Sequence, residues 1–368
     1  MGGSVPRGCA SHPVLRGGRP ASVGHGGWIV TTTSYLLRRL GWSILVLVGL
    51  SITIFVIARV VPGDPARMAL GPRAPEEVVQ QLREEMHLDK PLYIQYLYWI
   101  KGAVRGDFGY SLMTKRPVMD DLKQFAPNTI ELVVMAGLLE STLGLLLGII
   151  GAMYANRAID TGIRVMGYVF VATPSFVVAV FLLLVFGFWW PILPAIGGRL
   201  SPSIALHRIT GFVTLDALMQ GNLRAFGDAL AHLILPALAL AVGGMAQEAR
   251  ITRASMLDNM GKDYVSALTS QGVPRRVVMS KYLLRPSVIP TVSIMGLDFA
   301  SLFGNAFLVE LVFTWPGLSR YGIMSMLRKD LNAICAVVLF MGLVFVVMNL
   351  IVDVVVSLLD PRIRLGAK

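Results

Sequence analysis

Charged residues are scarce in this chain. Asp, Glu, Lys and Arg make up 15% of its 368 residues, whereas a typical soluble domain has about 25%. Hydrophobic residues reach 55%, and the mean hydropathy is positive. This balance excludes an ordinary soluble globular protein and favours a chain that crosses a membrane several times.

Cysteine and histidine are also rare, with two Cys and five His. Cys9 lies in a polar stretch and Cys335 in an apolar run, which excludes a disulfide framework and a thiolate metal site. The His residues show no metal-ligand spacing. The Gly261–Lys262 pair lacks the upstream glycine of a phosphate-binding loop. We therefore predict no cofactor, no metal and no ATP hydrolysis by this chain alone.

The net charge of +11 would by itself suggest a nucleic-acid partner. However, the basic residues lie mainly at the ends of apolar runs and not on one hydrophilic face. Positive-inside membrane topology explains that pattern more simply. We therefore predict that the chain binds no nucleic acid.

Hydropathy predicts an all-α, polytopic membrane protein with six transmembrane helices, because a bilayer core needs about 20 apolar residues per helix. The expected spans are approximately 36–60, 128–153, 163–188, 231–254, 287–313 and 333–358. Residues 1–34 are rich in Gly, Arg, Ser and Pro, and we expect a disordered extension there, with an alternative start at Val30. Residues 365–368 would form a short tail.

A basic, polar island at 258–290 separates two of these spans. From residue 249 to residue 286, seven Lys and Arg stand against two Asp, and such an excess marks the side that is not translocated. Basic residues also flank the first and last spans on the same side. Both termini are therefore predicted to be cytoplasmic.

Residues 61–127 would then form a long external region. Ten Lys and Arg between Arg59 and Lys123 stand against nine acidic residues, a balance compatible with translocation. Pro75, followed by two Glu and by apolar residues at helical spacing, predicts a short amphipathic helix. The second outer loop, 189–229, is rich in Trp, Pro and Gly and should be irregular.

Polar residues inside the spans are expensive and often functional. Asp298, Ser301 and Asn305 share one helical face over about 10 Å. We predict that this face lines a water-filled translocation path and that Asp298 contacts the ammonium group of a substrate; a buried, hydrogen-bonded carboxylate is the alternative. Glu310, near the outer end of the same span, is predicted either to form an outer gate or to reach the interface.

Two further patterns concern the second span. Glu131 and Glu140 are nine residues apart, about half a turn out of phase, so both cannot face the path. At least one of them should pair within the bundle or sit at an interface. The glycines of this span, Gly144, Gly148 and Gly151, share a face and predict a seam for close helix packing.

Five short stretches carry a family resemblance: VPGDP at Val61–Pro65, LDKPLYIQYLYW at Leu88–Trp99, GDFGYS at Gly106–Ser111, FTWPGLSRYG at Phe313–Gly322 and DPRIR at Asp360–Arg364. Together with the six spans, their order resembles the permease subunits of ATP-binding-cassette importers, in the dipeptide, oligopeptide and nickel branch. The resemblance covers residues 35–364. It implies the type I importer permease fold and a place in the bacterial inner membrane.

The same resemblance implies the partners. They would be a second homologous permease subunit, two cytoplasmic ATP-binding subunits, an external substrate-binding protein and membrane lipid. Since separate subunits would hydrolyse ATP, the chain would be a transport subunit and not an enzyme. The implied substrates are di- and oligopeptides, with nickel or another small solute as the alternative, and a homodimeric pore stays open.

The loop 258–290 is similar to the family's coupling motif of Glu-Ala-Ala, three residues, Gly and a later Pro. The matching positions are Ser266, Ala267, Leu268, Gly272 and Pro290, so the Glu and the second Ala are replaced. We predict a short helix over 262–271, broken at Gly272, that docks into a groove of an ATPase. Its apolar anchor would be Tyr264, Val265 and Leu268. A plain inner loop that binds anionic lipid is the alternative.

A self-sufficient, ion-coupled secondary transporter or channel is the rival interpretation, with Asp298, Glu131 or Glu140 as an ion relay. Such transporters often carry paired, interrupted hydrophobic segments, and the hydropathy of the six spans shows none. A membrane-embedded enzyme is a third option, disfavoured because the sequence shows no nucleophile and base pair.

Overall fold

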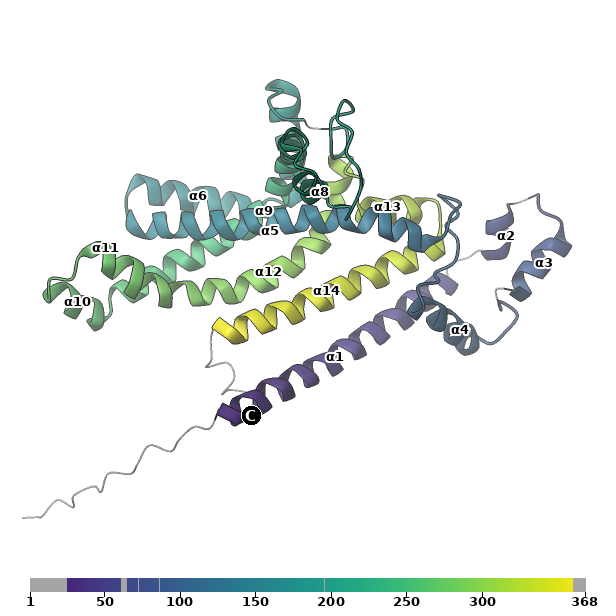
Figure 1. Ribbon diagram of the computed structural model, residues 1–368, viewed down its shortest axis with the longest axis horizontal. Helices are drawn as coiled ribbons and strands as arrows, with labels where there is room; N and C mark the ends of the chain where they lie inside the picture. The colour runs from purple at the N-terminus through teal and green to yellow at the C-terminus, as the bar shows by residue number, and fades with distance from the viewer. Residues whose placement is uncertain (1–24, 61–64, 72, 86, 195, 360–368) are drawn as a thin grey trace, which may run out of the picture.

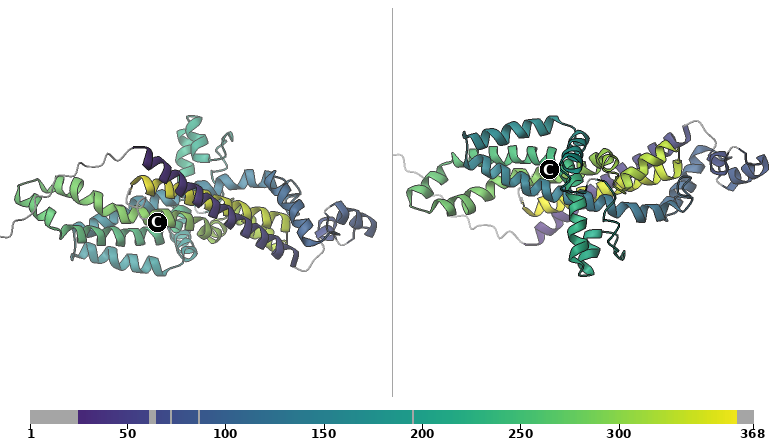
Figure 2. Two further views of the ribbon diagram at one scale, coloured as in Figure 1. Left: turned by 90° about the horizontal axis from the view of Figure 1, so that it is seen from below. Right: turned by 90° about the horizontal axis from the view of Figure 1, so that it is seen from above.

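The computed structural model describes residues 25–60, 65–71, 73–85, 87–194 and 196–359. Long helices dominate this part of the chain and lie side by side (Figures 1 and 2). They are α1 (His25–Val60), α5 (Val118–Met153), α9 (Leu223–Met260), α12 (Leu284–Val312) and α14 (Leu331–Leu359). Within the described residues, five runs are long and apolar enough to span a membrane, and a bent pair of helices makes a sixth if it is counted as one span. The stretches 61–64 and 360–364 of the family motifs lie outside the described residues.

The third predicted span is not one straight helix. α6 (Ala158–Ala172) meets α7 (Ser175–Leu182) at a bend of 109°, and α7 continues as the π-helix η1 (Leu183–Trp189). Pro174 explains the break, because it disfavours helical backbone at Thr173, which is extended with φ −96° and ψ 123°. Hydropathy does not reveal this bend. One bent span among the described residues is not the pair of interrupted segments that is typical of secondary transporters.

Several helices are longer than hydropathy predicts. α5 has 36 residues, which gives a helix about 54 Å long, whereas the bilayer core is only about 30 Å thick. Its ends therefore continue beyond the apolar core. Similarly, α1 begins at His25, so residues 25–34 of the predicted extension are helical, while residues 1–24 and the tail 365–368 lie outside the described part.

α5 and α9 form the central helix pair, and α12 packs against both. Their contact is lined by buried apolar side chains such as Leu132, Leu240 and Phe303. The predicted glycine seam of α5 faces α9: a Cβ on Gly148 would lie 2.5 Å from the Cβ of Thr252. The two backbones therefore approach more closely than any larger residue at that position would allow.

Short helices occupy two opposite ends of the bundle (Figure 1). At one end are α2 (Pro65–Leu70), α3 (Glu76–Glu85) and α4 (Leu92–Val104), and at the other are α10 (Asp263–Ser270), α11 (Arg275–Val277) and the π-helix η2 (Val278–Leu283). α3 confirms the predicted amphipathic helix. The remaining short helices are α8 (Val213–Met219), in the otherwise irregular second outer loop, and α13 (Leu318–Leu327).

Candidate translocation site and docking loop

The predicted polar face of α12 lines a cavity. Asp298, Ser301 and Asn305 border a space of about 480 Å³ between α12, α9 and the α6–α7 bend. Ser301 and Asn305 are exposed, and Asp298 is half-buried. The helical period thus brings these three polar residues to one cavity, as the spacing predicts.

The wall across from α12 includes the break in the third span. Thr173, Pro174 and Ser175 line the cavity, together with Gly243 and Gly244 of α9. Irregular backbone at membrane depth is tolerated where it lines a cavity, because solvent or substrate can satisfy its polar groups. The break therefore contributes a non-helical, polar patch to the same space.

The two glutamates of α5 point to different surroundings, as their half-turn offset predicts. Glu131 pairs with Arg199 of the second outer loop and accepts hydrogen bonds from the Thr214 N–H (2.7 Å) and hydroxyl (2.6 Å). Glu140 instead lines the cavity. One glutamate therefore fastens an outer loop to the bundle, and the other belongs to the candidate site.

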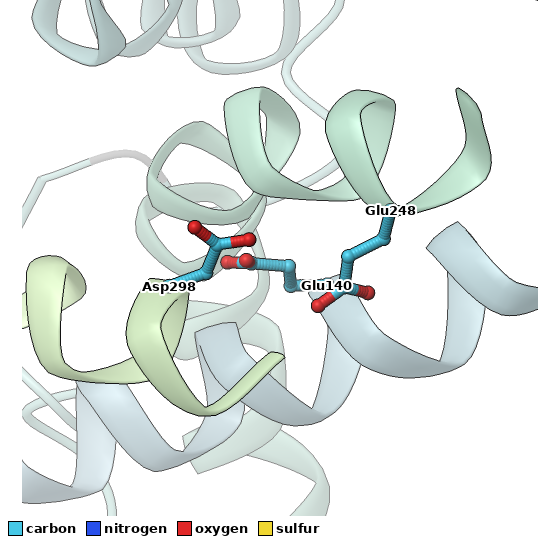
Figure 3. A group of neighbouring side chains, drawn as sticks. All are labelled: Glu140, Glu248 and Asp298. Carbon is cyan, nitrogen blue, oxygen red and sulfur yellow. The ribbon is translucent and has the colours of Figure 1, made fainter. Parts of the chain in front are cut away.

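Sequence reasoning missed Glu248 of α9. Its side chain is fully buried, and its carboxylate lies near those of Glu140 and Asp298, with one oxygen of each within 4.8 Å of the others (Figure 3). The sequence contained a signal. On α5 a Glu precedes a Gly by four residues (Glu140, Gly144), and on α9 a Gly precedes a Glu by four residues (Gly244, Glu248). Only the pairing of the two helices shows that these positions meet.

Glu310 is fully buried near the C-terminal end of α12. Its carboxylate accepts hydrogen bonds from the Thr129 hydroxyl of α5 (2.5 Å) and from the Arg320 N–H (2.9 Å). A Cβ on Gly317 would overlap this carboxylate, so the glycine of the Trp-Pro-Gly turn makes room for it. A gating role for Glu310, which stays a prediction, would act through the turn 313–317.

A second outer motif is bound to the same end of the bundle. The Ser111 hydroxyl, at the end of the stretch Gly106–Ser111, donates to the Asp330 carboxylate (2.6 Å). Asn332 donates to the Tyr110 carbonyl (3.1 Å). These contacts hold residues 106–111 against the start of α14, so the region 61–127 and the last span meet at this end of the bundle.

α10 matches the helix predicted over 262–271 to within a residue at each end. It ends just before Gly272, whose φ of +77° lies in the left-handed region that glycine adopts without strain. The predicted break at Gly272 is therefore confirmed.

The residues of the predicted anchor lie on different faces of α10. Tyr264 and Ala267 are exposed and Leu268 is half-buried, so they are accessible to a partner. Val265 packs onto a small cluster that includes Met256, so it supports α10 from beneath. α10 also lies at the end of the bundle opposite α2, α3 and α4 (Figure 1).

An ion pair ties α9 to α6 above this loop. The Arg253 guanidinium donates to both oxygens of the buried Asp160 carboxylate, at 2.5 Å and 2.7 Å. Two parallel N–H···O bonds fix the orientation of both side chains. Movement of the C-terminal end of α9 would therefore carry α6 with it.

Comparisons with known proteins decide the family. Residues 144–365 match the binding-protein-dependent transport system inner membrane component, and residues 32–133 match the N-terminal part of such membrane components. The chain belongs to this family. It is a multi-pass permease subunit of an ATP-binding-cassette importer in the inner membrane, and not an enzyme. An ATPase and a substrate-binding protein are the partners that such a system requires.

Curated relatives are similar along almost their whole length. They include the "Probable D,D-dipeptide transport system permease protein DdpB" of Escherichia coli, 36% identical over 90% of this chain and 98% of the relative. The dipeptide permease DppB of Alkalihalophilus pseudofirmus is 34% identical over 90% of this chain and 99% of its own. The glutathione permease GsiC of Shigella flexneri has the same identity and the same two coverages.

Proposed function

We propose that this permease admits short peptides with a free amino terminus. The relatives described above are permeases for D,D-dipeptides, dipeptides and glutathione. The observation that carries the proposal is the stripe of Asp298, Ser301 and Asn305 along the 480 Å³ cavity. A carboxylate next to amide and hydroxyl groups suits a peptide, which presents an ammonium group and hydrogen-bonding amides.

The proposed path requires a second wall. Only one helix of the bundle contributes the predicted stripe, and the cavity opens at the surface of this chain. A second, homologous permease packed against this surface would enclose the path, and two cytoplasmic ATPases would drive it. Exposed large apolar side chains on the bundle, including Leu297 and Leu308 of α12, favour such packing against another apolar surface or lipid.

The proposed docking element is α10. Tyr264, Ala267 and Leu268 would enter a groove of the ATPase, while Val265 supports the helix and Gly272 ends it. Both chain termini would share the cytoplasmic side with α10. The external region 61–127 and the turn region 313–322, at the other end, would receive the loaded binding protein.

The experiment combines co-purification with transport. The chain is isolated from native membranes in mild detergent, and its partners are identified by mass spectrometry for the wild type and for Tyr264→Asp. We expect two ATPases and a second six-span permease with the wild type, and loss of the ATPases alone with the variant. Recovery of this chain by itself would contradict the proposed assembly.

Substrate class is tested on the reconstituted complex in proteoliposomes. We expect ATP-dependent uptake of a labelled dipeptide, with little uptake of its N-acetylated form, because acetylation removes the ammonium charge. Asp298→Asn should reduce uptake of the free dipeptide while basal ATPase activity persists. Uptake of nickel chelates without uptake of any peptide would overturn the peptide assignment.

A further inference from the structure

On each of the helices α5 and α9, a buried glutamate packs against a glycine of the other helix. A Cβ on Gly244 of α9 would overlap the Glu140 carboxylate of α5. Conversely, a Cβ on Gly144 of α5 would lie 2.7 Å from Oε2 of Glu248 on α9. Each glutamate is four residues from the glycine on its own helix, and the two helices run parallel, so each carboxylate lies against the glycine of the other helix. Both glycines are therefore required by the glutamates that they face.

Asp298 of α12 adds a third carboxylate to this pair. One oxygen from each of Glu140, Glu248 and Asp298 lies within 4.8 Å of the other two. Figure 3 shows the three neighbouring side chains on three different helices, with the Glu140 carboxylate turned toward that of Asp298. Glu140 and Glu248 are 2% and 0% exposed, so neither side chain is hydrated by bulk solvent.

The carboxylates have no compensating group in the described part of the chain. All four oxygens of Glu140 and Glu248 are buried without a hydrogen-bond partner there, and so is Oδ2 of Asp298. An unpaired buried carboxylate is costly, and three together repel one another. The packing of each glutamate against a glycine nevertheless holds the three carboxylates together. This arrangement points to a positively charged partner.

The partner that fits is a small, hard cation. Ca²⁺ binds carboxylate oxygens at about 2.3 to 2.6 Å, so two oxygens that bind one ion are at most about 4.6 to 5.2 Å apart. The three carboxylate oxygens, which all lie within 4.8 Å of one another, are close enough to bind one ion. A divalent ion also compensates more of the three negative charges than a substrate's single ammonium group does. In addition, Glu248 does not border the cavity, so a group attached to a peptide reaches only two of the three carboxylates.

We propose that Glu140, Glu248 and Asp298 form a divalent-cation site that joins α5, α9 and α12 beside the translocation cavity. The ion would take one oxygen from each helix and replace the missing partner of all three. Asp298 is shared with the cavity, so the ion would stand directly behind the polar stripe. It would therefore fix the position of the residues that we assign to peptide passage.

The test uses the assembled complex in lipid nanodiscs without nucleotide. The complex is treated with a chelator, dialysed into metal-free buffer and then given Mg²⁺, Ca²⁺ or Mn²⁺ alone. Bound metal is counted by plasma mass spectrometry, and the melting temperature is recorded. We expect about one ion per permease chain with carboxylate ligands of this kind, together with a melting temperature that falls on chelation and recovers with the metal.

Two matched pairs of variants make the assignment specific. Glu248→Gln should abolish the response to metal, while Glu77→Gln on the exposed face of α3 should keep it. Gly244→Ala, which displaces Glu140, should weaken metal affinity by more than about tenfold. Gly243→Ala should not, because a Cβ there meets no atom within 4 Å.

Three results would overturn the proposal. They are no retained metal with any of the three ions, an equal metal response in the wild type and in Glu248→Gln, and stabilisation by a dipeptide's ammonium group in place of metal. The first two results leave the proposed peptide transport untouched, because peptide uptake is measured separately, whereas the third would support it.

Discussion

Glu131 of α5 and Arg199 of the second outer loop form a buried ion pair. Their side chains are only 7% and 12% exposed, so the pair lies in a low-dielectric environment. Arg199 also donates to the Gly211 carbonyl (2.9 Å), and Glu131 accepts from Thr214. These bonds occupy both terminal nitrogens of Arg199 and both oxygens of Glu131, and they fasten the loop, α8 and α5 to one another.

Replacing Arg199 with Met should therefore destabilise the protein strongly. Breaking a buried pair by removing one partner leaves an uncompensated charge and costs about 3–5 kcal/mol. Arg105→Met is the matched control, since Arg105 is an exposed arginine of the region 61–127 and its replacement should change the free energy of unfolding by about 0.5 kcal/mol or less. Denaturant unfolding in detergent micelles measures both. Equal losses for the two variants would contradict a special role for the pair.

Asp216, in α8, gives a prediction with a defined pH dependence. Burial raises the pKa of this carboxyl, but hydrogen bonds from the Thr210 hydroxyl and from the N–H groups of Thr210, Ile209 and Gly211 outweigh burial and hold the pKa below its usual value. The ionised form is thus favoured by folding. Its contribution to stability is present above the unfolded pKa and is lost as the pH falls through the folded pKa.

Asp216→Asn should accordingly lower the free energy of unfolding by about 1–3 kcal/mol at pH 7, because one acceptor oxygen becomes a donor that faces other donors. The gap between wild type and variant should narrow below about pH 4. Asp89→Asn, at an exposed position, serves as the control and should show no gap. Melting temperatures from pH 7 to pH 3.5 measure the effect, and a gap that stays constant over this range would refute it.

The parts of the site that could be predicted are those that follow from the geometry of one helix. A spacing of three and seven residues places Asp298, Ser301 and Asn305 on one face in any α-helix. The offset of Glu131 from Glu140 is equally local. The end of the helix at Gly272 is also predictable from the sequence, because helices commonly end at a glycine.

The parts that could not be predicted depend on contacts between helices or on the membrane boundary. Hydropathy locates the apolar core of the bilayer, so it cannot show that α5 begins at Val118, well before its apolar stretch. Hydropathy is also averaged over the whole span, so it does not reveal the 109° bend at Pro174. Glu248 gains its meaning only when α9 is placed against α5, because no pattern on one helix reveals which helix faces it.

The glycine seam of α5 gives a packing prediction. A Cβ on Gly148 would meet the Ala249 carbonyl oxygen at 2.7 Å as well as the Thr252 side chain, and the backbone atom cannot move aside as a flexible side chain can. Overpacking of this kind costs about 1–3 kcal/mol.

We therefore expect Gly148→Ala to lower the melting temperature and Gly162→Ala to leave it unchanged or raised. Gly162 lies on α6, where a Cβ meets no atom within 4 Å, and alanine favours a helix over glycine by about 1 kcal/mol. Thermal unfolding in nanodiscs distinguishes the two. A stabilised Gly148→Ala variant would show that α5 and α9 are not packed at this point.

In the docking loop, alanine is expected to strain the backbone at one glycine, Gly272, and not at another nearby glycine, Gly261. Gly272 has a φ of +77°, so an alanine there is strained by roughly 1–2 kcal/mol. Gly261, at the end of α9, has a φ of −79°, and its Cβ would come no closer than 3.7 Å to another group. Alanine at Gly261 is therefore unstrained.

If α10 must be held in its present shape to bind an ATPase, the strain at Gly272 opposes binding. A penalty of 1–2 kcal/mol corresponds to roughly a 5- to 30-fold loss of ATPase affinity. Titration of purified ATPase onto the permease in nanodiscs should show this loss for Gly272→Ala and none for Gly261→Ala. The melting temperature of the transmembrane bundle should be the same for both, because α10 lies at its end. Wild-type affinity in Gly272→Ala, with the loop strained, would mean that the ATPase binds elsewhere.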